Sequence, residues 1–87
     1  MKDTVKKLKA IADKNRFKIV KILLKNSYCV RGLSNILDIS ESAVSQHLKI
    51  LREADIVVGE KEGYFVHYRV KKENIKSIAE AIKGIVE

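Results

Sequence analysis

The sequence predicts a mostly α-helical domain with one small β-hairpin. Apolar residues recur at the helical period up to about residue 54, and again from about residue 73 to the end. Between these regions the period changes to 2, and Gly63 stands where a tight turn needs a positive φ. The 87 residues contain no linker, repeat or low-complexity segment, so we expect a single domain over residues 1–87.

Two helices are expected in the first third of the chain. Val5, Leu8 and Ile11 recur at helical spacing and predict a helix over about residues 3–12. Asp13 is expected to cap a second helix, over about residues 14–25, because its carboxylate can accept hydrogen bonds from the free amides of the first turn. The apolar residues expected to face inward are Phe17, Val20, Leu23 and Leu24, and those expected along one outer face are Lys14, Lys18, Lys21 and Lys25.

Two shorter helices, separated by about three residues, are expected next. The first covers about residues 30–37, and Ser40 is expected to cap the second, which ends near Glu53. Glu41 in the first turn complements the positive end of the helix dipole. Two short helices joined in this way predict a helix-turn-helix over about residues 30–53.

A hairpin and a last helix complete the expected order. Residues 55–60 are rich in β-branched side chains, and residues 64–70 alternate, so we expect a hairpin over about residues 55–71. Six apolar residues at helical spacing, Ile75, Ile78, Ala79, Ile82, Ile85 and Val86, predict an amphipathic helix over about residues 73–87. This order of elements is that of a winged helix-turn-helix, in which the hairpin is the wing.

The positive charge is concentrated at the beginning of the chain. The formal net charge is +7, and residues 1–26 carry all of it, because residues 27–87 contain equal numbers of basic and acidic side chains. Such asymmetry favours a polyanionic partner, nucleic acid ahead of membrane, although a solvated lysine face is the plain alternative. No apolar run approaches the roughly 18 residues that cross a bilayer, so we expect a cytoplasmic protein with no membrane partner.

Three runs of residues resemble one family in the right order. IADKNRFKIVKILLKN, LSNILDISESAVSQHLKILREADIV and EKEGYFVHYRV are similar to successive signatures of the ArsR-type transcriptional repressors, and together they cover nearly the whole chain. The resemblance implies a homodimer that places its second helix-turn-helix element in the major groove of an operator. It also implies release from the operator when a metal or another signal arrives.

The DNA-reading helix of that family corresponds to Ser40 through Glu53 in this chain. The residues matched to DNA contact are Ser40, Ser42, Ala43, Ser45, Gln46, His47 and Lys49. Short Ser and Ala side chains near the start of the helix allow a close approach to the groove. Gln46 can pair bidentately with adenine, and Lys49 can neutralise a phosphate. The alternative role of His47 is packing. The alternative for Gln46 is that it is an exposed polar residue with no functional role.

Other basic residues are expected to contact the DNA backbone. They are Lys14, Arg16 and Lys18 near the start of the second helix, and Lys61 and Arg69 in the wing. The wing tip is acidic at Glu60 and Glu62, so either these two cations alone make the wing's contact with DNA or the wing contributes little to affinity. Asp38 occupies a turn position where the family commonly has Gly, and a left-handed φ there would cost about 1–2 kcal/mol.

The residues that metal-sensing members of the family use are incomplete in this chain. One family site needs two cysteines separated by one residue, but here Cys29 is followed by Arg31 at the second position. Another needs Asp and His ligands in the last helix, and no histidine follows His67. We therefore expect no metal site and no cofactor. For Cys29 itself, a small buried side chain and a redox switch are the two interpretations.

The resemblance implies that the first and last helices form the dimer interface. The candidates are Val5, Leu8, Ile78, Ile82 and Ile85, and the alternative is that they belong to the core of one chain. A two-fold dimer predicts a pseudopalindromic operator with half-sites about one helical turn apart.

These residues bear on four possible functions. A dimeric sequence-specific DNA-binding regulator, a repressor by the resemblance, agrees with the exposed polar helix. The acidic wing favours a winged-helix protein-interaction module, and the lysine-rich start is compatible with non-specific DNA binding. An enzyme is not expected, because the sequence offers no nucleophile and base pair, carboxylate pair or phosphate loop.

Overall fold

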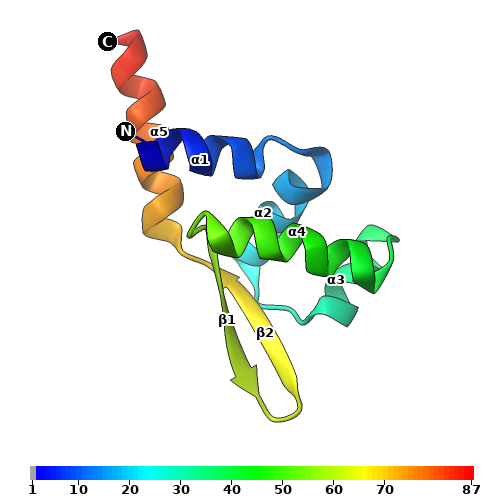
Figure 1. Ribbon diagram of the computed structural model, residues 1–87. Coiled ribbons are helices and arrows are strands. Elements are labelled where there is room, and N and C mark those ends of the chain that lie inside the picture. Colours follow the sequence, from blue (N-terminus) through cyan, green and yellow to red (C-terminus); the bar gives the residue numbers. More distant parts are fainter. Residues whose placement is uncertain (1) are drawn as a thin grey trace.

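Five helices and one hairpin follow one another along the chain in the predicted order (Figure 1). The computed structural model describes the backbone of residues 2–87 and the side chains of residues 3–87, so Met1 of the expected domain lies outside the described residues. The elements are α1 (Lys2–Ile11), α2 (Lys14–Lys25), α3 (Val30–Leu37), α4 (Glu41–Glu53), β1 (Val57–Glu62), β2 (Phe65–Val70) and α5 (Lys72–Val86). The predicted winged helix-turn-helix is confirmed.

Side chains and turns at the helix ends account for where the helices begin and stop. Asp13 Oδ2 accepts the amides of Asn15 and Arg16, each at 3.0 Å, which starts α2 as expected. Ser40 Oγ accepts the amide of Ala43 at 3.0 Å and starts α4 in the same way. Asp38 ends α3 in the left-handed region, with φ 56°, so this turn carries the predicted strain.

The hairpin differs from its predicted limits at the first strand. We expected the strand to begin at Asp55, but Asp55 has a φ of 62° and β1 starts at Val57. A left-handed residue cannot continue an extended ladder, so Asp55 only turns the chain out of α4. The strand runs on to Glu62, which pairs with Phe65, and Gly63 takes the positive φ of 63° that this two-residue turn requires.

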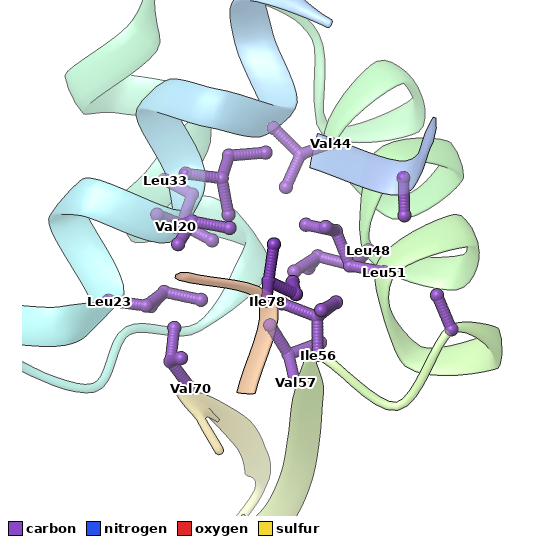
Figure 2. Close-up of a cluster of buried hydrophobic side chains, with 13 residues drawn as sticks. Val20, Leu23, Leu33, Val44, Leu48, Leu51, Ile56, Val57, Val70 and Ile78 are labelled. Carbon is purple, nitrogen blue, oxygen red and sulfur yellow. The ribbon is translucent and has the colours of Figure 1, made fainter. Parts of the chain in front are cut away.

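A single core lies where the helices and the base of the hairpin meet (Figure 2). The largest fully buried side chains are Ile19, Leu33, Val44, Leu48, Leu51, Ile56 and Val57. They come from α2, α3, α4, the first residue of β1 and the residue before it, while Ile78 adds α5 to the same cluster. The outer half of the hairpin extends away from this core as a wing, and the end of α5 extends beyond α1 (Figure 1).

Two large apolar side chains lie at the surface, one of them against expectation. Phe17 was predicted to face inward, but it is 53% exposed, and Ile36 of α3 is 51% exposed. Helix α2 instead buries Ile19, Val20 and Leu23. Two residues along a helix turn the side chain by about 200°, so Phe17 lies on the side of α2 opposite Ile19, which is fully buried.

Candidate nucleic-acid interface

Helix α4 separates its apolar residues cleanly from its polar ones. Val44, Leu48 and Leu51 are buried, which fixes the rotation of the helix on the domain. The opposite positions leave a row of polar side chains exposed: Ser42, Ser45, Gln46 and Lys49. Ala43 is half-buried, and Ser40 contributes its hydroxyl to the cap. The exposed row therefore consists of small hydroxyls followed by one amide and one ammonium group, all able to hydrogen-bond a ligand.

His47 faces the turn between α1 and α2 rather than open solvent. Its side chain is only 18% exposed, and Nδ1 lies 3.4 Å from Nη1 of Arg16 and 3.8 Å from Oδ2 of Asp13. Arg16 also donates from Nε to the carbonyl oxygen of Ala10 at 2.5 Å. The hydrogen bond from the Arg16 amide, and then the charges of Arg16 and His47, lower the pKa of the Asp13 carboxyl. Of the two roles considered for His47, packing is the one that this geometry supports.

The basic residues expected to meet phosphates occupy different environments. Lys14, Lys18 and Lys49 are exposed, and no described carboxylate lies within 4 Å of them. Arg16 is half-buried, and its guanidinium is held by the Ala10 carbonyl and faces His47. Arg16 therefore positions α4 and has fewer free donors for DNA than the lysines.

One ion pair within the wing joins its two strands. Arg69 Nε donates to Glu60 Oε1 at 2.9 Å across the two strands. The His67 Nδ1 atom lies 3.1 Å from Glu62 Oε2, although the direction of this contact does not satisfy hydrogen-bond geometry. Lys61 is exposed and has no carboxylate within 4 Å among the described side chains. Of the two wing cations, only Lys61 is unengaged for contact with a phosphate.

A second set of contacts holds the base of the wing on α5. Lys71 Nζ donates to Asp55 Oδ1 at 2.5 Å, and Asn74 Nδ2 donates to the Asp55 backbone oxygen at 2.6 Å. The hydrogen bond from Lys71, followed by its charge, lowers the pKa of Asp55. The sequence pattern did not reveal these contacts, because 16 to 19 residues separate the partners along the chain.

Cys29 lies at the junction of the helix-turn-helix and the wing. Its backbone caps α3 and its Sγ accepts the amide of Gly32 at 3.4 Å. The thiol is half-buried, so it is neither a core side chain nor fully open. It lines a hollow of about 380 Å³ between the helix-turn-helix and the wing, together with Arg31, Glu41 and Phe65. Its role as a redox switch stays a prediction.

The five dimer candidates divide between surface and core. Val5, Ile82 and Ile85 are exposed on α1 and α5, by 53%, 46% and 83% respectively. Leu8 is half-buried and packs against the core. Ile78 is 4% exposed and belongs to the core of the chain itself, which was the alternative for this set. Ile78 is therefore unavailable to a second copy.

The described residues contain neither a metal-binding cluster nor a membrane-spanning helix. In that part of the chain, no three His, Cys, Asp or Glu side chains come together in a group able to hold a metal ion. None of the described helices has the length and apolar character that crossing a bilayer requires.

Comparison with known proteins addresses the identity of this fold. Residues 13–58, which contain the whole helix-turn-helix, match the family described as "Bacterial regulatory protein, arsR family". The chain belongs to the ArsR family. Members of this family are DNA-binding transcriptional regulators and not enzymes, and the matched segment includes all of α4.

ArsR relatives with related sequences have different named functions. A cadmium resistance regulatory protein, a CadC homologue from Staphylococcus aureus, is 35% identical over 90% of this chain and 65% of its own length. The transcriptional activator HlyU of Vibrio cholerae is 39% identical over 86% of this chain and 69% of its own length. The chain thus spans about two thirds of the length of these ArsR proteins.

Solved ArsR-type structures share the fold. The reduced form of HlyU from Vibrio cholerae superposes with a TM-score of 0.80 at 36% identity, over 95% of this chain and 87% of that one. The winged helix-turn-helix domain of a possible ArsR-family regulator from Mycobacterium bovis reaches 0.81 at 19% identity, over 98% and 79% of the two chains. The second likeness concerns the fold alone.

Proposed function

We propose that this protein is a homodimeric, sequence-specific transcriptional repressor that inserts α4 into the major groove of an operator. One observation carries the proposal: α4 exposes Ser42, Ser45, Gln46 and Lys49 in one row while its other side is buried. A helix held in this way can meet base edges without losing contact with the core.

The side chains of this row have separate roles. Ser42 and Ser45 are short, so the first turns of the helix can approach the groove closely, and their hydroxyls can bond phosphate or base edges. Gln46 reads adenine through N6 and N7. Lys49 neutralises a phosphate without reading sequence. His47 contacts Arg16 and so helps to hold α4 in position on the domain.

Dimer formation through α1 and α5 is the second part of the proposal. An exposed apolar surface on α1 and α5 is formed by Val5, Ile82 and Ile85. Such a surface is typical of an interface with another protein chain. The related Mycobacterium bovis domain is described as homodimeric. Two copies related by a two-fold axis would bind a pseudopalindromic operator with half-sites about one helical turn apart.

The signal that releases the operator is proposed to be something other than a bound metal. Cadmium and arsenic are named for several relatives, but this chain has Arg31 where a second cysteine would be needed beside Cys29. A fixed positive charge there opposes metal binding. No metal or other cofactor is therefore proposed, and Cys29 is the residue at which a search for the signal begins.

A second candidate function rests on the wing. Its carboxylates Glu60 and Glu62 would face phosphate if the wing were pressed against DNA, which opposes tight contact there. A protein-interaction module, or a DNA-binding protein without sequence preference, would tolerate such a wing.

A comparison of DNA affinities separates these functions. The affinity for DNA from upstream of the protein's own gene is measured beside that for a scrambled duplex, at two salt concentrations. We expect the wild type to prefer its own DNA by at least about 10³ and Gln46→Ala to lose about 1–3 kcal/mol of this preference. Lys49→Ala is the matched control, because it should weaken both duplexes alike and reduce the salt dependence. Equal binding of both duplexes by the wild type would contradict operator reading, and a reporter gene downstream of the bound site distinguishes repression from activation.

A further inference from the structure

Exposed apolar side chains flank a row of lysines on the outer face of α2. The row comprises Lys14, Lys18 and Lys21, which follow one another at intervals of four and three residues and so share one side of the helix. Phe17 is 53% exposed beside this row, and Ile36 of α3 is 51% exposed. Exposed apolar side chains also lie on α1 and α5, where the dimer interface is proposed, but Phe17 and Ile36 belong to α2 and α3 and that interface does not account for them.

Two shallow hollows bring these side chains together. One, of about 420 Å³, is lined by Phe17, Ile11 and Ala12, by Asp13, whose carboxylate caps α2, and by the lysine row. The other, of about 290 Å³, is lined by Ile36 with Ile22 and Leu37. Both hollows also include Lys18 and Lys21, so these two lysines stand between an apolar hollow on the α1 side and another on the α3 side. Neither hollow includes a residue of α4 or of the hairpin.

The two lysines are free to pair with a partner. Lys18 and Lys21 are exposed, and none of the described carboxylates lies within 4 Å of either ammonium group. Their aliphatic stems line the hollows, so a ligand can contact the stems and the charges at once. The surface therefore presents an apolar, a cationic and a second apolar zone in sequence.

We propose that this surface, formed by Phe17, Ile36, Lys18 and Lys21, binds an acidic amphipathic helix of a partner protein. The partner would place large apolar side chains at positions i and i+7 and carboxylates at i+3 and i+4, all on one face. The outer pair is then about 10 Å apart, with the carboxylates between them. This order matches the apolar, cationic and apolar zones on the chain.

Other occupants fit this surface less well. A DNA backbone would satisfy the lysines but has no apolar groups to cover Phe17 and Ile36. A second copy related by a two-fold axis would set the same lysines against each other. An acidic helix neutralises the lysines and covers both apolar side chains, and it leaves α4 free to bind DNA.

Fluorescence anisotropy with two synthetic helical peptides tests the proposal on the full chain. Both peptides carry Leu at i and i+7, and they differ only in Glu or Lys at i+3 and i+4. We expect the Glu peptide to bind, with affinity falling as salt is raised, and the Lys peptide not to bind. Phe17→Ser should weaken the affinity for the Glu peptide at least tenfold. Phe65→Ser, at an equally exposed phenylalanine of the wing, should leave this affinity unchanged.

Charge reversal gives a second variant that leaves the apolar residues in place. The variant Lys18→Glu/Lys21→Glu should no longer bind the Glu peptide and should bind the Lys peptide instead. The proposal is overturned if the Glu peptide does not bind, or if Phe17→Ser and Phe65→Ser weaken it equally. It is also overturned if the charge-reversed variant loses DNA binding while Phe17→Ser still binds both DNA and the Glu peptide, because the lysines then serve DNA. A change in the sedimentation of the protein alone by Phe17→Ser would overturn it as well, because the surface would then contact a second copy of the chain. Operator binding by Phe17→Ser is measured alongside, so failure here is distinguishable from failure of the proposed function.

Discussion

His47 Nδ1 lies 3.4 Å from Nη1 of Arg16, and this contact joins α4 to the first turn of α2. Arg16 is held in turn by the carbonyl of Ala10, and its backbone amide bonds the Asp13 carboxylate. The helix proposed to read DNA is therefore positioned by polar contacts as well as by its buried leucines.

Removing the Arg16 guanidinium should destabilise the domain. Arg16→Ala leaves the Ala10 carbonyl and His47 without their partner, and we expect the free energy of unfolding to fall by about 1 kcal/mol. For a domain of this size that corresponds to about 4–8 °C in the thermal midpoint. Lys18→Ala is the control, because the Lys18 side chain is exposed. Equal midpoints for the two variants would show that the Arg16 contacts contribute no net stability.

The Asp55 carboxylate should make folding sensitive to acid. Its pKa is lowered in the folded chain, first by the hydrogen bond from Lys71. A carboxyl with a lowered pKa favours folding above its unfolded pKa and loses that contribution as the pH falls through the folded value. We therefore expect the thermal midpoint of the wild type to fall as the pH is lowered below about 4. The thermal midpoint of Asp55→Asn should fall less steeply. Asn tolerates the left-handed φ of this position, so thermal unfolding from pH 7 to pH 2 isolates the charge. Parallel curves would exclude a contribution from Asp55.

Two glycines should respond to alanine with opposite signs. A Cβ on Gly59 would lie 2.9 Å from ring and methyl carbons of Tyr68 and Val66, so Gly59→Ala must displace one of them. At Gly84, within α5, a Cβ meets nothing within 4 Å, and Ala should stabilise the helix by at most about 1 kcal/mol. Thermal unfolding of both variants checks the expectation that Gly59→Ala lowers the midpoint and Gly84→Ala raises it. Stabilisation by Gly59→Ala would contradict the close packing of Tyr68 on β1.

A charge on the exposed face of α5 should separate the proposed dimer. Ile82→Asp and Ile85→Asp place a carboxylate where a second copy would bury an apolar side chain, which is strongly unfavourable. We expect sedimentation velocity to show a monomer for each variant at micromolar concentration. Tyr64→Asp, at the fully exposed tip of the wing, is the control and should leave the dimer intact. A dimer that persists in both α5 variants would place the interface elsewhere.

Replacing Cys29 by serine should preserve the fold while removing the thiol. The Sγ atom accepts the Gly32 amide, and a serine hydroxyl is a stronger acceptor at this position, so the stability of α3 should not decrease. If Cys29 is a redox switch, peroxide lowers operator affinity in the wild type and leaves Cys29→Ser unchanged. Operator titrations before and after peroxide measure this directly. Equal loss in both proteins would assign the effect to another residue.

Much of the candidate site was predictable because it depends on local patterns. Ser40 and Asp13 start their helices as expected, since a cap needs only its own side chain and the next turn. The exposed row containing Gln46 and Lys49 follows from the spacing of Val44, Leu48 and Leu51. The start of β1 was placed too early, because β-branched residues indicate a strand but not the left-handed turn at Asp55.

The order and type of the elements and the rotation of α4 were predictable from the amino acids, because periodicity and capping act within a few residues. The concentration of charge in the first third of the chain is visible in the composition. The burial of Ile78, the exposure of Phe17 and the contact of His47 with Arg16 emerge from the packing of the folded chain. The reason is physical: an apolar face is wider than the contact that covers it, and which part is covered depends on neighbours distant along the chain.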